Sequence, residues 1–187
     1  MATTEILLTS ARYVKDVTSI SDNLAGKFLL PSILEVQNTR YRQIVGTCLL
    51  DRLKDLVSTG DITLEENAAY KDLLDRSQEF LAYCSVAECC VKTSGKVSNS
   101  GVSRTYDENL QAATFGEVMQ MRDYYTFKAD AACRILQDWI RANQAALPEL
   151  AGCGCSGTSP NLWSSASCQV YLGGARGKKL PGGGGCC

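Results

Sequence analysis

The 187-residue chain contains no histidine, and this absence excludes several classes of chemistry. A Ser-His-Asp or Cys-His nucleophile needs histidine, and so does a zinc site with imidazole ligands. The side chain that most often carries protons near neutral pH is missing as well. An enzyme built on carboxylates, lysine or tyrosine is the remaining catalytic alternative. The acidic side chains suited to it lie on the exposed face predicted for the helix around residues 65–75, so we expect no enzyme.

Long apolar runs are also absent. No stretch approaches the roughly 20 apolar residues that span a bilayer, so we expect no membrane partner. The N-terminus has no basic region, and the apolar run Ile6–Leu8 is too short for a secretory signal. We therefore expect synthesis inside the cell, where cysteine thiols stay reduced.

Neither sign of charge is in excess, with 19 basic and 20 acidic residues. The distribution is uneven, however, because residues 152–187 carry only Arg176, Lys178 and Lys179. The rest of the chain therefore has 16 basic and 20 acidic residues, a net charge of −4. This basic segment has the sign needed to attract the acidic body of a neighbouring copy, although such a split also arises by chance.

Composition divides the chain into two parts. Residues 1–150 have ordinary globular composition and are long enough to bury a core. Residues 151–187 hold 10 of the 16 glycines and 5 of the 10 cysteines, and such a segment cannot fold alone. We expect a helical domain over 1–150 and a flexible or extended arm over 151–187. The arm's largest apolar residues, Trp163, Tyr171 and Leu172, are its expected docking anchors.

Two long helices are predicted by the same signal. Thr63–Glu66 and Thr114–Glu117 both read T-x-x-E, the pattern of a capping box at a helix N-terminus. Each opens a segment of about 28 residues with apolar side chains three or four apart, typical of an amphipathic helix. The first stripe contains Tyr70, Leu73, Leu74, Leu81, Cys84, Ala87 and Val91. The second contains Val118, Met121, Tyr125, Ala129, Ala132, Leu136 and Ile140.

Shorter helices are predicted upstream. They cover residues 10–17, about 22–44 and 47–57, with Gly46 as an interruption. Pro31 marks either a break or a first-turn position in the second of them. The sequence therefore predicts an all-α fold: a helical bundle with two long antiparallel helices, an irregular loop between them and an extended C-terminal arm.

The connection between the long helices, residues 94–113, is polar and has no clear period. A loop of this length is uncommon unless it is functional or held against a partner. Within it, Val97, Val102 and Tyr106 predict a short hairpin.

The ten cysteines invite a metal interpretation. The arm contains Cys153–Cys155 and Cys186–Cys187 pairs, whose spacing is too short for a zinc knuckle. We therefore predict no metal or cofactor site. Cys84 and Cys133 are expected to act as small buried hydrophobes, and any disulfide pairing is left open. The final Gly-Gly-Gly-Gly-Cys-Cys resembles a prenylated terminus, but the GTPase domain that prenylation needs is not present.

One run of residues carries a resemblance. The segment Lys96–Arg104 reads K-x-S-N-x-G-V-x-R and precedes a tyrosine-rich helix with Tyr124 and Tyr125. Together with Phe80–Tyr83, this resembles head–tail connector (adaptor) proteins of tailed bacteriophages, notably those of gut Bacteroidales and crAss-like phages. The likeness covers about residues 5–150.

The resemblance implies a structural virion protein in the neck, made in the bacterial cytoplasm. Such subunits form a ring, commonly of twelve copies, beneath the portal protein. The ring extends the channel for genomic DNA without reading its sequence, and it docks further neck or tail proteins. Carried onto this chain, the subunit-contact loop contains Lys96, Asn99, Val102 and Arg104.

The alternative is a small helical binding module with a cysteine-rich tail that binds a metal or has a redox role. Tyr124, Tyr125, Phe127 and Trp139 also allow a stacking platform for nucleic acid. Their helical spacing favours core and subunit-interface residues instead.

Overall fold

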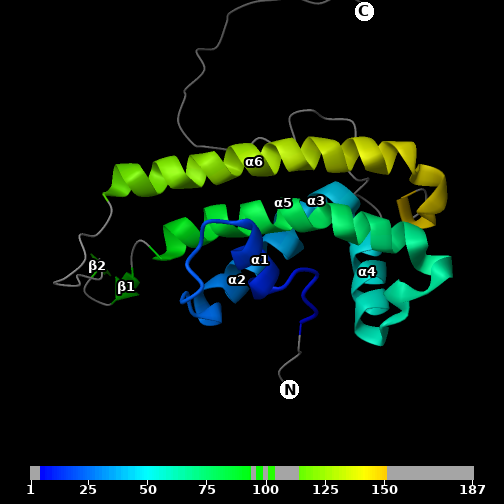
Figure 1. Ribbon diagram of the computed structural model, residues 1–187, viewed down its shortest axis with the longest axis horizontal. Coiled ribbons are helices and arrows are strands. Elements are labelled where there is room, and N and C mark those ends of the chain that lie inside the picture. The colour runs from blue at the N-terminus through cyan, green and yellow to red at the C-terminus, as the bar shows by residue number, and fades with distance from the viewer. Residues whose placement is uncertain (1–4, 94–95, 99–100, 104–113, 151–187) are drawn as a thin grey trace, which may run out of the picture.

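The computed structural model describes residues 5–93, 96–98, 101–103 and 114–150, and its fold is all-α (Figure 1). Two long antiparallel helices, α5 (Ala68–Thr93) and α6 (Phe115–Ala142), form the most extensive contact in the bundle. Helix α6 lies along one edge of the molecule, and α5 separates it from α1, α2 and α4. The predicted helical bundle is therefore confirmed.

Four helical segments precede α4 in the chain. They are α1 (Ala11–Val17), α2 (Gly26–Val36), the π-helical turn η1 (Gln37–Tyr41) and α3 (Arg42–Val45). Ser10 caps α1 by accepting a hydrogen bond from the amide of Tyr13. Pro31 lies inside α2, so the prediction of a break or a first-turn proline was wrong. The helix continues because proline removes one backbone donor while its neighbours stay packed, with Ser32 and Ile33 fully buried.

The remaining elements lie at the end of the bundle opposite the connection between α5 and α6. They are α4 (Thr47–Thr59), the 3₁₀ turns η2 (Asp61–Thr63) and η3 (Glu65–Asn67), and the 3₁₀ turns η4 (Gln144–Ala146) and η5 (Pro148–Leu150). Gly46 and Gly60 have positive φ (83° and 82°), which lets the chain turn sharply at each end of α4. The predicted apolar face of this helix is confirmed, since Leu49, Leu50, Leu53 and Leu56 are buried.

The two predicted capping boxes have different outcomes. At α6 the amide of Glu117 donates to Thr114 Oγ1 (3.3 Å), and the Glu117 carboxylate accepts from the Thr114 amide (2.7 Å). At α5 the prediction was wrong, because the α-helix begins only at Ala68. Thr63 ends a 3₁₀ turn instead, and its hydroxyl donates to the Gly60 carbonyl (3.1 Å).

The connection between α5 and α6 contains an antiparallel hairpin. Its strands are β1 (Lys96–Ser98) and β2 (Gly101–Ser103), with Val97 paired to Val102. This confirms the predicted hairpin at those two residues, while Tyr106 lies outside the described residues.

The core divides into two clusters that share α5. The larger joins η1, α3 and α4 to α5 and α6, with Tyr41, Leu53, Leu81 and Leu136 at its centre. The smaller packs α1 and α2 against α5 and contains Val14, Leu29, Ile33 and Val86. Because α5 contributes to both clusters, none of its residues from Phe80 to Cys90 is exposed.

The described cysteines are in two states. Cys84, Cys89 and Cys90 are free thiols, and Cys84 is the buried small hydrophobe predicted from its stripe. Cys133 is fully buried as well, but it takes part in a disulfide bond, and so does Cys48. The sequence left the disulfide state of these two positions open, and the structure decides it.

Candidate interaction surface

The predicted contact loop lies in the connection between α5 and α6. Lys96 occupies the first position of β1, paired with Ser103, and Val102 occupies the middle of β2. Asn99 and Arg104 lie outside the described residues. The structure therefore places two of the four predicted contact residues on one hairpin at one end of the bundle (Figure 1).

The predicted arm is not part of the described structure. Its anchors Trp163, Tyr171 and Leu172 lie outside the described residues, as does the whole of 151–187. The chain leading to it is held in place by Leu147, which is fully buried, and by Glu149. The Glu149 carboxylate accepts hydrogen bonds from the Tyr70 hydroxyl at 2.8 and 2.9 Å.

Exposed large apolar side chains occur near the hairpin end on both long helices. Val91, near the end of α5, is 41% exposed, and Phe115 and Met121, at the start of α6, are 59% and 51% exposed. We call these three residues the hairpin-end patch. Sequence periodicity placed Val91 and Met121 in buried stripes, and this was wrong. The stripes run the full length of each helix, but the residues packed against α5 and α6 do not cover their ends at the hairpin.

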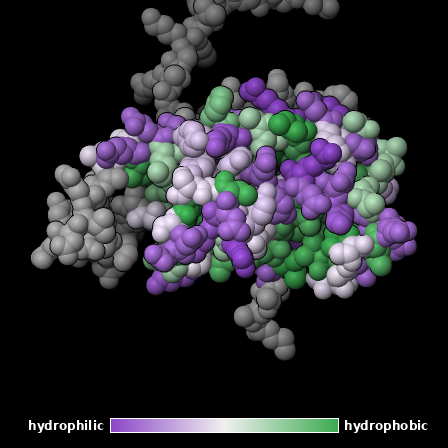
Figure 2. Space-filling model, in the orientation of Figure 1, coloured by the Kyte–Doolittle hydropathy of each residue, from purple (hydrophilic) through white to green (hydrophobic). Residues whose placement is uncertain are grey.

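A second exposed apolar row follows α6 toward its C-terminus. We call it the outer stripe, and it consists of Tyr124, Phe127, Ala131 and Ile135. These residues are three or four apart, so they share one helical face. Figure 2 shows hydrophobic atoms breaking the hydrophilic surface along the edge that α6 forms.

Helix α6 is therefore apolar on two opposite faces. Its inner face includes Tyr125, Ala129, Leu136 and Ile140, all buried in the bundle. Phe127 on the outer stripe is 76% exposed, the largest value among the exposed apolar side chains of the described residues. The sequence pattern predicted the inner face as a stripe and named Tyr124 and Phe127 as core or subunit-interface residues, but it did not predict the row that they form with Ala131 and Ile135.

The ring of Tyr124 is held in position although it is half-exposed. It meets the buried Tyr125 ring edge to face, with centroids 5.2 Å apart. The Lys128 ammonium lies 4.7 Å from its centroid and 5.4 Å from that of Tyr83. Tyr125 in turn accepts a hydrogen bond from the amide of Ser19 (2.9 Å). An exposed aromatic side chain fixed in this way loses little rotamer freedom on binding a partner.

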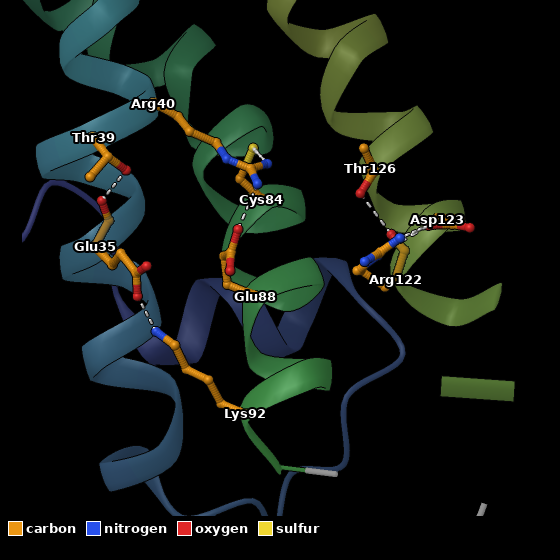
Figure 3. Close-up of polar contacts among 9 residues, drawn as sticks. All are labelled: Glu35, Thr39, Arg40, Cys84, Glu88, Lys92, Arg122, Asp123 and Thr126. Atoms are coloured by element: carbon orange, nitrogen blue, oxygen red, sulfur yellow. Dashed lines mark hydrogen bonds and ion pairs between the residues drawn. The ribbon is translucent and has the colours of Figure 1, made fainter. Parts of the chain in front are cut away.

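A cluster of charged side chains lies between η1 and α5 (Figure 3). Arg40 donates to the Glu88 carboxylate at 2.6 Å, and both side chains are about a quarter exposed. Its other terminal nitrogen lies 3.8 Å from the sulfur of Cys84. One helical turn further along α5, Lys92 pairs with Glu35 of α2. These two ion pairs tie α2 and η1 to α5.

This cluster does not present an activated nucleophile. Burial raises the pKa of the Cys84 thiol to about 12, and the nearby Arg40 guanidinium only partly offsets it. Burial also raises the pKa of Asp130, against the opposing charges of Arg134 and Arg40. The thiol therefore stays protonated near neutral pH, and the cluster acts as a polar connection between helices.

The described residues contain neither a membrane-spanning helix nor a metal-binding cluster. No helix among them is long and apolar enough to cross a membrane. Within the same residues, no group of three or more histidine, cysteine, aspartate or glutamate side chains is placed to hold a metal ion. The arm cysteines lie outside the described residues.

Comparison with known proteins places the chain in a family. The model of the family of unknown function DUF6712 matches residues 41–159, well over half of the chain. This protein therefore belongs to that family. The match covers α4, α5, the hairpin and α6, the elements that carry the hairpin-end patch and the outer stripe. No curated protein and no solved structure matches the chain.

Proposed function

We propose that this protein is a structural virion protein without catalysis: a head–tail connector that forms a ring beneath the portal protein. The observation that carries the proposal is the hairpin-end patch. Val91, Phe115 and Met121 expose apolar surface at the end of the bundle where the Lys96–Arg104 run begins. The sequence likeness to phage connectors and an exposed contact surface thus fall on the same end of the molecule.

The physical properties of the subunit support this role. A ring subunit needs a stiff body, and α5 and α6 are 26 and 28 residues long and packed along each other. A closed ring also requires two different faces that meet by rotation. The hairpin end exposes apolar side chains, whereas residues 51–79 at the other end carry eight acidic and four basic residues. Two such different ends suit a head-to-tail contact better than a symmetric one.

In this role the partners are further copies of the chain, the portal protein and the next neck or tail proteins. Genomic DNA passes through the channel without sequence-specific contacts. The subunit needs no cofactor for this, and its location is the virion neck after synthesis in the host cytoplasm.

The oligomeric mass of the purified full chain tests the proposal. A dodecamer has twelve times the subunit mass of 20.2 kDa, which is 242 kDa. We expect mass photometry and negative-stain microscopy to show rings, either for the chain alone or after mixing with the portal protein of the same genome. A chain that stays at 20.2 kDa in both experiments contradicts the proposal.

A pair of matched variants localises the contact. Met121→Asp places a charge in the hairpin-end patch and should abolish ring formation without loss of helix content. Leu64→Asp is the control, because Leu64 is 47% exposed, close to the 51% of Met121, but lies just before α5 at the opposite end. Equal loss of assembly in both variants argues against the hairpin-end patch as the contact.

A further inference from the structure

The outer stripe on α6 is an apolar surface that the described residues leave open. Tyr124, Phe127 and Ile135 are 53%, 76% and 63% exposed, and Ala131 between them is exposed as well. The row covers eleven residue steps, about 17 Å of helix. Contiguous exposed apolar surface of this kind commonly marks a binding site.

The chain itself contains a segment with matching properties. Residues 151–187 follow directly on η5 and include Trp163, Tyr171 and Leu172 among small and polar residues. Each aromatic ring of this segment can bury a large area against the exposed aromatic and aliphatic side chains of the outer stripe. The small residues between the rings do not obstruct that contact. The segment is too poor in apolar residues to form a core of its own.

The length of this segment lets it reach the outer stripe of the same copy. Its root is held at the C-terminal end of α6, where Leu147 is buried and Glu149 bonds Tyr70. Twelve residues separate Leu150 from Trp163, and an extended chain of that length spans about 40 Å. From the end of α6 at Ala142 back to Phe127 is fifteen residues, about 23 Å along the helix axis.

Tethering and charge both favour binding within one molecule. A short flexible tether gives an effective concentration in the millimolar range, well above that of free chains in dilute solution. The segment has three basic residues and no acidic one, whereas residues 1–151 carry a net charge of −4. The long-range field of the body therefore attracts the segment.

We propose that residues 151–187 fold back along α6 and bind the outer stripe of their own copy, with Trp163 against Phe127 and Tyr124. This assignment does not depend on the connector role, because it concerns a contact within one chain. It also separates two surfaces of α6: the hairpin-end patch for other proteins and the outer stripe for the chain's own C-terminal segment.

Fluorescence of Trp163 in the full chain tests the proposal. The sequence has two tryptophans, so Trp139→Phe leaves Trp163 as the single reporter. We expect its emission at a shorter wavelength than that of free tryptophan and several-fold weaker quenching by acrylamide, both independent of protein concentration. Adding Phe127→Ser and Ile135→Ser should restore solvent-like emission, whereas Leu64→Ser on the opposite end should not. Solvent-like emission in the parent overturns the proposal.

Because Trp139 packs near Arg76 and the core, its substitution carries a risk to folding. Photo-crosslinking avoids that risk, with p-benzoylphenylalanine in place of Phe127 in an otherwise unchanged full chain. In a mixture of isotopically light and heavy protein, crosslinks to residues 151–187 should join peptides of the same isotope label. Crosslinks that join light to heavy peptides overturn binding within one copy and identify a second copy as the occupant. Crosslinks to no part of 151–187 overturn the proposal altogether.

Discussion

The two long helices are similar in length but differ in how completely the bundle covers them. In α5 no residue from Phe80 to Cys90 is exposed, because α1, α2, the α4 region and α6 pack around it. In α6 the same bundle covers only one face, and Phe127 and Ile135 point to the outside. Apolar residues thus have different roles in the two helices. In α5 they hold the fold together, and on the outer face of α6 they are available for binding.

The largest expected effect comes from a matched pair of alanine substitutions. Leu81→Ala in α5 removes a fully buried side chain and should lower the free energy of unfolding by about 2–5 kcal/mol. Phe127→Ala in α6 removes a larger side chain that the bundle leaves mostly exposed, and it should change the free energy of unfolding by much less. Urea denaturation followed by far-ultraviolet circular dichroism measures both. Similar losses in the two variants would remove the distinction between the helices.

A second expected effect is alkaline loss of stability that originates in α5. Burial raises the pKa of Cys84 to about 12, from an ordinary value of 9.0, so the unfolded thiol ionises first. Between these two pKa values the native state binds more protons than the unfolded state does. The free energy of unfolding therefore falls as pH rises from about 9 toward 12. The slope from one such group is about 1.4 kcal/mol per pH unit.

Comparison of the intact chain with Cys84→Ala isolates this contribution. Burial also raises the pKa of Tyr41, so part of the alkaline loss should persist in the variant. Urea denaturation between about pH 8 and pH 11 should give a shallower slope for Cys84→Ala than for the parent. Parallel slopes would show that the thiol does not contribute.

The smallest expected effect distinguishes how the two helices begin. Thr114→Ala removes the capping box of α6 and should cost about 1 kcal/mol. Thr63→Ala removes only a hydrogen bond to the Gly60 carbonyl in an exposed turn and should cost less. Thermal denaturation of the two variants compares them. A larger loss for Thr63→Ala would indicate a capping role at α5 after all.

The same cap has a pH signature with a definite sign. Hydrogen bonds from the Thr114 amide and then its hydroxyl lower the pKa of the Glu117 carboxyl. Its contribution is therefore present at neutral pH and is lost as pH falls through that lowered pKa.

Much of the fold was predictable because local signals act over short distances. The spacing of Leu49, Leu50, Leu53 and Leu56 predicts the buried face of α4, and the Thr114–Glu117 box predicts the start of α6. Both features depend on residues within one or two helical turns of each other. The T-x-x-E at Thr63 failed because the same four letters also fit a 3₁₀ turn, and packing in that turn decides the outcome.

The candidate surface was less predictable, for a related reason. A three-and-four spacing shows that residues share a helical face, but it does not show whether another element covers that face. Met121 and Leu136 belong to the same predicted stripe as Tyr125 and Ala129, yet Met121 is half-exposed and Leu136 is fully buried. Only the position of α5 and its neighbours along α6 separates them.

The sequence by itself determined the helical character, the position of most helices and the short hairpin. These follow from periodicity, capping and the conformational preferences of glycine, which are local. The tertiary structure decided which apolar faces are buried, that Cys48 and Cys133 are disulfide-bonded, and that Arg40 meets Glu88 across two helices. Burial and such contacts depend on residues far apart in the chain, so no local pattern contains them.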